Sequence, residues 1–294
     1  MKVQIKVLFL FSFILSLIFL PLHSYAANEP SKVINVVYDD SGSMIYDFDS
    51  KIKVDTWCQA KYSMEVFAAM LGQKDTMNVY VMSDYYNKTA SAPRLTLYGS
   101  DGTAANVKKV HALLTDASET PFHSVEKAYS DLVNLSGDEK WLVILTDGMF
   151  SGIPDEGIDG YFSHKDPSIN VMFLGMGPFA ESISDYPSQG IFSEKAETSS
   201  QILTKITEIC TRIFSTDKLT NISNNQITFD VPMSELTVFA QGEDVQIKGL
   251  FGPDGKSAGE AEPVEVVYSE TATSRKAEVY NNPIIDKELR GKIV

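Results

Sequence analysis

Hydrophobic residues follow two alternating patterns between residues 31 and 216. Continuous runs of β-branched and aliphatic residues predict strands that are buried on both faces of a sheet. Segments whose apolar residues recur every three or four positions predict amphipathic helices. The predicted strands cover residues 33–38, 76–82, 94–98, 140–145, 169–174 and 190–196, and the predicted helices cover residues 56–71, 104–114, 121–135 and 199–214. This alternation of strands and helices favours right-handed crossovers and a mostly parallel α/β sheet with helices on both faces.

Two local features complete the prediction for this part of the chain. Residues 149–165 contain three glycines and three acidic residues, and they predict a loop at the edge of the sheet, directly after the fourth strand. The last helix has Ser199 or Ser200 as its expected N-cap, because a serine hydroxyl can accept a hydrogen bond from a first-turn amide.

Beyond residue 216 the pattern changes to short segments in which apolar and polar residues alternate. Turn signals such as the Gly-Pro-Asp-Gly sequence at 252–255 separate them, and no long helical pattern is present. Residues 217–294 therefore predict a small all-β domain, an immunoglobulin-like sandwich. The sequence stops inside a segment typical of a strand, so we expect the sandwich to be incomplete here or to complete itself in an unusual way.

Residues 1–26 have the features of a secretory signal peptide. Lys2 and Lys6 precede an apolar run over residues 7–22, and Ser24 and Ala26 offer small side chains at a cleavage site. An uncleaved membrane anchor is the alternative, because the run is close to the shortest length that spans a bilayer. In both cases we expect the rest of the protein to be secreted or to lie at the cell surface.

The net negative charge of the chain disfavours some classes of binding partner. The chain carries a formal net charge of −14, and removal of residues 1–26 with their two lysines makes it −16. Nucleic acids and anionic membranes repel an acidic surface. We therefore expect no nucleic-acid partner, and we expect contact with a membrane only through the signal or anchor segment.

Side chains with oxygen donors gather at the ends of two predicted strands. Asp39, Ser41 and Ser43 directly follow the first strand, and Asp147 follows the fourth within the sequence Thr-Asp-Gly. Thr120 lies in the loop before the third helix. In open α/β sheets the carboxyl ends of the strands form the ligand-binding edge. Oxygen donors without Cys or His favour Mg²⁺, with Mn²⁺ or Ca²⁺ as alternatives, over zinc or copper.

The order Asp-x-Ser-x-Ser, a distant Thr, and a strand that ends in Asp-Gly resembles the metal-ion-dependent adhesion site of the von Willebrand factor A (VWA) domain family. The resemblance covers residues 31–216, and it implies a doubly wound fold. It also implies that Ser41 and Ser43 bind the cation directly, that Thr120 joins or leaves as its loop moves, and that Asp39 and Asp147 hold the ion, often through water. The sixth ligand would be a Glu or Asp of a partner protein.

The two cysteines, Cys58 and Cys210, lie in the first and last predicted helices of this domain. Two cysteines are too few for a disulfide scaffold. In the VWA family the first and last helices lie side by side, so the resemblance is compatible with a Cys58–Cys210 disulfide, which export would permit. Two buried free thiols are the alternative.

Enzymatic functions fit the motifs less well than binding does. A haloacid-dehalogenase-type phosphatase would need a second Asp two residues after Asp39, where Ser41 stands. A serine hydrolase is disfavoured because Ser43 is not in a Gly-x-Ser-x-Gly motif, and His123 and His164 are in no triad context. We therefore predict that the protein is not an enzyme but a metal-dependent adhesion or protein-binding module. A scaffold of a cell-envelope complex is the alternative.

Overall fold

The computed structural model describes residues 30–47, 52–53, 56–86, 90–114, 119–177, 180 and 183–214, together with five short strands further along the chain. The predicted signal peptide at residues 1–26 lies outside the described residues. Among the described residues, no helix is both long enough and apolar enough to cross a membrane.

The main sheet has six strands, and all but one of them run parallel. The strands are β1 (Lys32–Tyr38), β4 (Thr76–Val81), β5 (Leu95–Tyr98), β6 (Glu139–Thr146), β7 (Ile169–Met176) and β8 (Ile191–Ala196). Their order in the sheet is β5-β4-β1-β6-β7-β8, and β5 pairs antiparallel with β4 at one edge. The predicted α/β fold with a mostly parallel, doubly wound sheet is thus confirmed.

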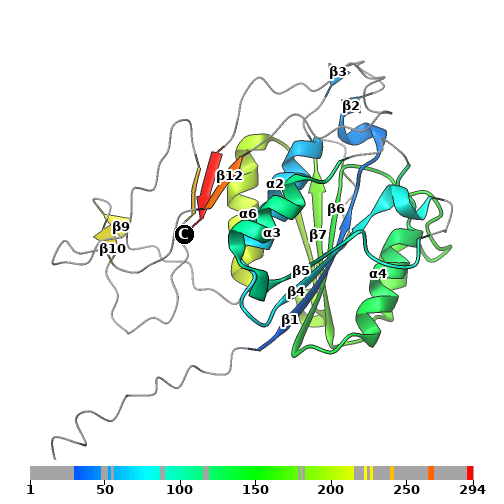
Figure 1. Cartoon of the computed structure of the whole chain (residues 1–294). Coiled ribbons are helices and arrows are strands. Elements are labelled where there is room, and N and C mark those ends of the chain that lie inside the picture. The colour runs from blue at the N-terminus through cyan, green and yellow to red at the C-terminus, as the bar shows by residue number, and fades with distance from the viewer. Residues whose placement is uncertain are drawn as a thin grey trace, which may run out of the picture.

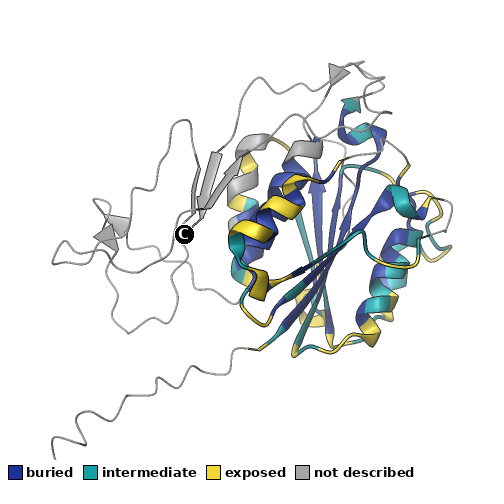
Figure 2. Cartoon of the chain, viewed as in Figure 1, coloured by how far each residue is buried: buried dark blue, intermediate teal, exposed yellow. Residues whose placement is uncertain are grey.

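Helices cover both faces of this sheet. One face carries α2 (Thr56–Ala69), α3 (Thr103–His111) and α6 (Ser199–Ile213), whereas the other carries α4 (His123–Asn134) and α5 (Gly157–Ser163) (Figure 1). The central strand β1 is buried along its whole length, with Ile34 and Val36 in one core and Val33 and Val37 in the other. Figure 2 shows the same two-sided burial across the sheet.

The structure corrects two local predictions. Residues 149–165 are not loop throughout, because they contain the short helix α5, whose Phe162 is buried against the core. The N-cap of α6 is Thr198 rather than Ser199 or Ser200. The Gln201 side-chain oxygen accepts a hydrogen bond from the Thr198 N–H at 3.3 Å, the reciprocal half of a capping box.

Only five short strands are described in the part of the chain where we predicted a β-sandwich. They are β9 (Ile222–Ser223), β10 (Gln226–Ile227), β11 (Phe239–Gln241), β12 (Val264–Val267) and β13 (Arg290–Ile293). Their pairings are antiparallel, as in the predicted all-β domain. The remainder of residues 217–294 lies outside the described residues, and the sandwich stays a prediction. A further small hairpin, β2 (Tyr46–Asp47) with β3 (Ile52–Lys53), follows β1.

The strand order creates a switch point between β1 and β6. From β1 the chain builds β4 and β5 on one side, and it then returns to place β6, β7 and β8 on the other. Helices that leave neighbouring strands toward opposite faces open a crevice at the carboxyl ends of those strands. Asp39 follows β1 and Asp147 follows β6, so both residues lie at the carboxyl ends of the two strands that flank this switch point.

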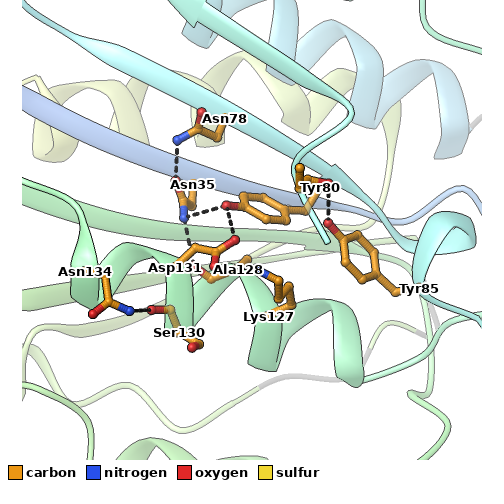
Figure 3. Close-up of polar contacts among 10 residues, drawn as sticks. Asn35, Asn78, Tyr80, Tyr85, Lys127, Ala128, Ser130, Asp131 and Asn134 are labelled. Atoms are coloured by element: carbon orange, nitrogen blue, oxygen red, sulfur yellow. Dashed lines mark hydrogen bonds and ion pairs between the residues drawn. The ribbon is translucent and has the colours of Figure 1, made fainter. Parts of the chain in front are cut away.

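A buried polar network ties helix α4 to strands β1 and β4 (Figure 3). The amide of Asn35 in β1 donates to the Ala128 carbonyl at 2.8 Å and to the Tyr80 hydroxyl at 3.3 Å. Its side-chain oxygen accepts a hydrogen bond from Asn78 at 2.9 Å. The Tyr80 hydroxyl in turn donates to Asp131 of α4 at 3.0 Å. Because Asn35, Asn78 and Tyr80 are buried, each of them depends on its neighbours in the network for hydrogen bonds.

We expect Asn35→Ala to lower the free energy of unfolding by about 2–3 kcal/mol, since it leaves the buried Asn78 amide without its acceptor and removes the side-chain donor that the Ala128 carbonyl has in addition to its helical hydrogen bond. Urea denaturation of the metal-free protein measures the change. Asn134→Ala is the matched control, because Asn134 only donates to the Ser130 carbonyl on the exposed side of α4. An equal loss in both variants would contradict a special role for the network.

Candidate metal centre

The turn after β1 is fixed by backbone contacts. The Asp39 N–H donates to the Leu145 carbonyl of β6 at 3.0 Å, which extends the pairing of the two strands to this residue. The Asp39 carboxylate then turns back and accepts a hydrogen bond from the Ser41 N–H at 2.9 Å. Residues Gly42–Met44 form a single 3-10 turn. Both Asp39 and Ser41 are buried, so the position of these side chains is set by the fold.

Hydroxyl groups link this turn to the end of β6. The Ser41 and Ser43 hydroxyl oxygens are 3.0 Å apart, and the Ser43 hydroxyl donates to Asp147 Oδ1 at 3.0 Å. Thr146 donates its hydroxyl to Asp39 Oδ2 at 2.6 Å. We call Asp39, Ser41, Ser43, Thr146 and Asp147 the oxygen cluster. The oxygen cluster contains four of the five metal ligands predicted from the sequence, all except Thr120. Its fifth member, Thr146, was not among the predicted ligands.

Thr120 lies at the same edge of the sheet, and its backbone is joined to the loop that follows Asp147. The Ser151 N–H donates to the Thr120 carbonyl at 2.8 Å, and the Phe122 N–H donates to the Ser151 carbonyl at 2.9 Å. Thr120 is buried, and Phe122 is fully buried against Phe150. Two hydrogen bonds and an aromatic contact therefore anchor the Thr120 segment beside the loop that leaves the oxygen cluster.

The two acidic residues of the cluster lie in an unfavourable environment for negative charge. Burial raises the pKa of Asp39 to about 6, against which the hydrogen bonds from Thr146 and Ser41 act, while the neighbouring Asp40 raises it further. Burial and then the negative charge of Asp39 raise the pKa of Asp147 to about 8. A bound cation would relieve both effects, because it replaces the lost hydration and separates the two negative charges.

The donor set fits a hard divalent cation. Carboxylate and hydroxyl oxygens are the ligands that Mg²⁺, Mn²⁺ and Ca²⁺ prefer. No group of three or more His, Cys, Asp or Glu side chains in the described part of the chain could hold a metal ion. A cation at this edge of the sheet would find the hydroxyls of Ser41 and Ser43 beside the carboxylates of Asp39 and Asp147.

Asp40 points away from the oxygen cluster. Its carboxylate accepts a hydrogen bond from the Ser83 N–H at 2.9 Å, in the turn that follows β4. Although Asp40 is fully buried and adjacent to Asp39, this contact directs it toward the neighbouring strand end.

The cysteines lie on two helices that pack against each other, α2 and α6. Cys210 is a free, buried thiol, and burial raises its pKa to about 12. A free thiol at Cys210 agrees with the alternative of unpaired cysteines and not with a Cys58–Cys210 disulfide, and the side chain of Cys58 lies outside the described residues.

Comparisons with known proteins give only distant similarities. No protein-family profile and no curated protein matches this chain. Among solved structures, the PilB minor pilin from Streptococcus sanguinis has 14% identity over 64% of this chain and 62% of its own, with a TM-score of 0.44. A von Willebrand factor type A protein from Catenulispora acidiphila has 16% identity over 62% of this chain and 42% of its own, with a TM-score of 0.41.

The pilus adhesin SpaC from Lactobacillus rhamnosus GG has 13% identity over 90% of this chain and 39% of its own, with a TM-score of 0.43. This chain thus spans less than two thirds of the length of each of the three structures. Similarities of this size give no information about function, which has to be argued from the site itself.

Proposed function

We propose that this protein is an exported, metal-dependent protein-binding module of the adhesion type. In this proposal a divalent cation, preferably Mg²⁺, is held by Asp39, Ser41, Ser43, Thr120 and Asp147. The observation that carries the proposal is the hydrogen-bonded oxygen cluster at the switch point between β1 and β6. Four of the five proposed ligands already converge there from two loops that are more than 100 residues apart in sequence.

The charge of the donor set supports binding of an acidic partner. Only Asp39 and Asp147 are acidic, while the other three proposed ligands are neutral hydroxyls. The cation would supply a positive, incompletely coordinated centre for an external carboxylate. The chain's own residues prepare that centre, because Thr146 and the Ser41 N–H orient Asp39 while Ser43 orients Asp147.

Binding is favoured over catalysis of the haloacid-dehalogenase type because no second Asp follows Asp39 at the position where such an enzyme needs its acid and base. The residue two positions after Asp39 is Ser41, whose N–H donates to the Asp39 carboxylate. A phosphatase of the haloacid-dehalogenase type would need an acidic side chain at that position. The hydroxyl of Ser43 contacts Ser41 and Asp147, and His123 contacts Glu126 at 2.9 Å, which is no arrangement for activating a serine nucleophile.

A carboxylate probe tests the proposed open position. We expect Mn²⁺ to bind the protein and to enhance the relaxation rate of water protons. A short peptide with a central Glu should then lower that enhancement severalfold, because it excludes water from the ion. The same peptide with Gln is the matched control and should have no effect. Failure of Mn²⁺ to bind, or an equal effect of both peptides, would overturn the proposal. Recovery of a partner from the protein's own cell envelope rather than from a foreign surface would identify an assembly scaffold.

A further inference from the structure

Arg94 connects the start of β5 with the turn that follows β4. Its Nε donates to Asp84 Oδ2 at 2.8 Å, and its Nη2 lies 2.6 Å from Asp84 Oδ1. The same Nη2 donates to the Ser83 hydroxyl at 3.2 Å, and Nη1 donates to the Leu114 carbonyl at 3.3 Å. A guanidinium that donates in a two-pronged fork restrains its partners in orientation as well as in distance.

The turn that Arg94 restrains is the 3-10 turn Met82–Tyr85, and this turn reaches the oxygen cluster through Asp40. The Ser83 N–H donates to Asp40 Oδ1 at 2.9 Å. Asp40 is fully buried, and it follows Asp39 directly in the chain. The Asp39 backbone is held on its other side by the Leu145 carbonyl of β6. The turn after β1 is thus fixed between two neighbouring strand ends, β6 on one side and β4 on the other.

We propose that Asp40, Ser83 and Arg94 form a brace that positions the Asp39–Ser43 turn for cation binding. The inference rests on the proposed metal site, and it assigns two positioning residues, Asp40 and Arg94, that touch neither the cation nor its partner. Asp40 sets the position of the turn through the Ser83 N–H. Arg94 fixes Ser83 and Asp84, so that this N–H stays aimed at Asp40.

An explanation based on charge alone predicts different cation affinities for variants of Arg94 and Asp40 than the brace does. Arg94 is positively charged, so its removal would tighten the binding of a cation if charge alone decided the affinity. Asp40 is negatively charged, so every variant that neutralises it would weaken binding to the same extent. The brace predicts instead that loss of Arg94 weakens binding, and that a neutral residue able to accept the Ser83 hydrogen bond preserves much of it.

The first comparison is Asp40→Asn with Asp40→Ala, with Mn²⁺ titrated into the purified chain by calorimetry. Both variants lose the charge, but only Asn keeps an oxygen that can accept the Ser83 N–H. We expect Asp40→Ala to bind Mn²⁺ about tenfold more weakly than Asp40→Asn, a typical effect of residues that orient metal ligands. Equal affinities in the two variants would overturn the brace.

The second comparison is Arg94→Met with Lys108→Met, which removes an exposed positive charge on α3. We expect Arg94→Met to weaken Mn²⁺ binding about tenfold and Lys108→Met to leave it within about twofold. Tighter binding by Arg94→Met would overturn the brace. Arg94→Lys, which keeps the charge without the fork, serves if Arg94→Met fails to fold, and it should also weaken binding.

Hydrogen exchange of the metal-free protein separates failure of the brace from failure of the metal site. We expect the amides of Ser83, Met44 and Ile45 to exchange at least tenfold faster in Asp40→Ala than in Asp40→Asn. If wild-type protein binds no Mn²⁺ but this difference is present, the brace stands as a structural element and the proposed function falls. If the exchange rates are equal, the brace is wrong whatever the metal does.

Discussion

Mg²⁺ or Mn²⁺ at about one hundred times its dissociation constant is expected to raise the melting temperature of the wild-type protein by about 5–10 °C. In the Asp39→Asn variant this rise should disappear. Asn retains the shape of the side chain and an oxygen that can accept the Ser41 N–H, so the metal-free fold is preserved. The Asp39→Asn substitution removes one of only two negative charges in the oxygen cluster, so the positive charge of a divalent cation is then poorly compensated.

Thermal unfolding with and without EDTA measures this effect. Asp155→Asn is the matched control, because Asp155 is an exposed carboxylate in the loop that follows the oxygen cluster. Its loss changes the net charge equally but removes no proposed ligand, so the metal-dependent rise should persist. A rise that survives Asp39→Asn, or that is lost in both variants, would place the cation somewhere else.

The sequence predicted the sheet well because the strands carry their own signal. Each of the four inner strands is a mainly apolar run, although single asparagines lie within β1, β4 and β7, and a run of this kind is stable only when both of its faces are covered. The proposed ligands were found for a related reason. Asp39 and Asp147 directly follow two such runs, and parallel strands bring their carboxyl ends to one edge.

Residues whose role depends on contacts across the fold were missed. Thr146 directly follows the predicted strand 140–145 and was not proposed as a site residue, although its hydroxyl directly before Asp147 was a usable signal. Ser83 reaches Asp40 only because β4 lies beside β1 in the folded sheet, and Arg94 reaches Ser83 only because β5 lies beside β4. The helix α5 escaped detection because it spans only seven residues and includes two glycines, so its helical period is too short to recognise.

The metal-free protein is expected to lose stability as the pH rises from about 5 to about 8.5. Asp39 and Asp147 have pKa values of about 6 and about 8 in the folded state, above the ordinary value of 3.8. Between these values the folded protein binds more protons than the unfolded chain, so the free energy of unfolding decreases with increasing pH. Buried Glu65, whose pKa is raised to about 8, acts in the same direction.

The Asp147→Asn variant isolates the contribution of the oxygen cluster. Asn can still accept the hydrogen bond from Ser43, but it does not ionise, so the loss of stability should be smaller by on the order of a few kcal/mol across this pH range. Urea denaturation in EDTA at several pH values gives the slope. Excess Mg²⁺ should flatten the wild-type slope, because the cation binds the ionised carboxylates and competes with their protons. The opposite result would be a wild-type stability that increases over this pH range, with a slope that Asp147→Asn leaves unchanged. It would show that the negative charges of the two carboxylates are already compensated without a metal. The electrostatic reason for a cation at this edge of the sheet would then be lost.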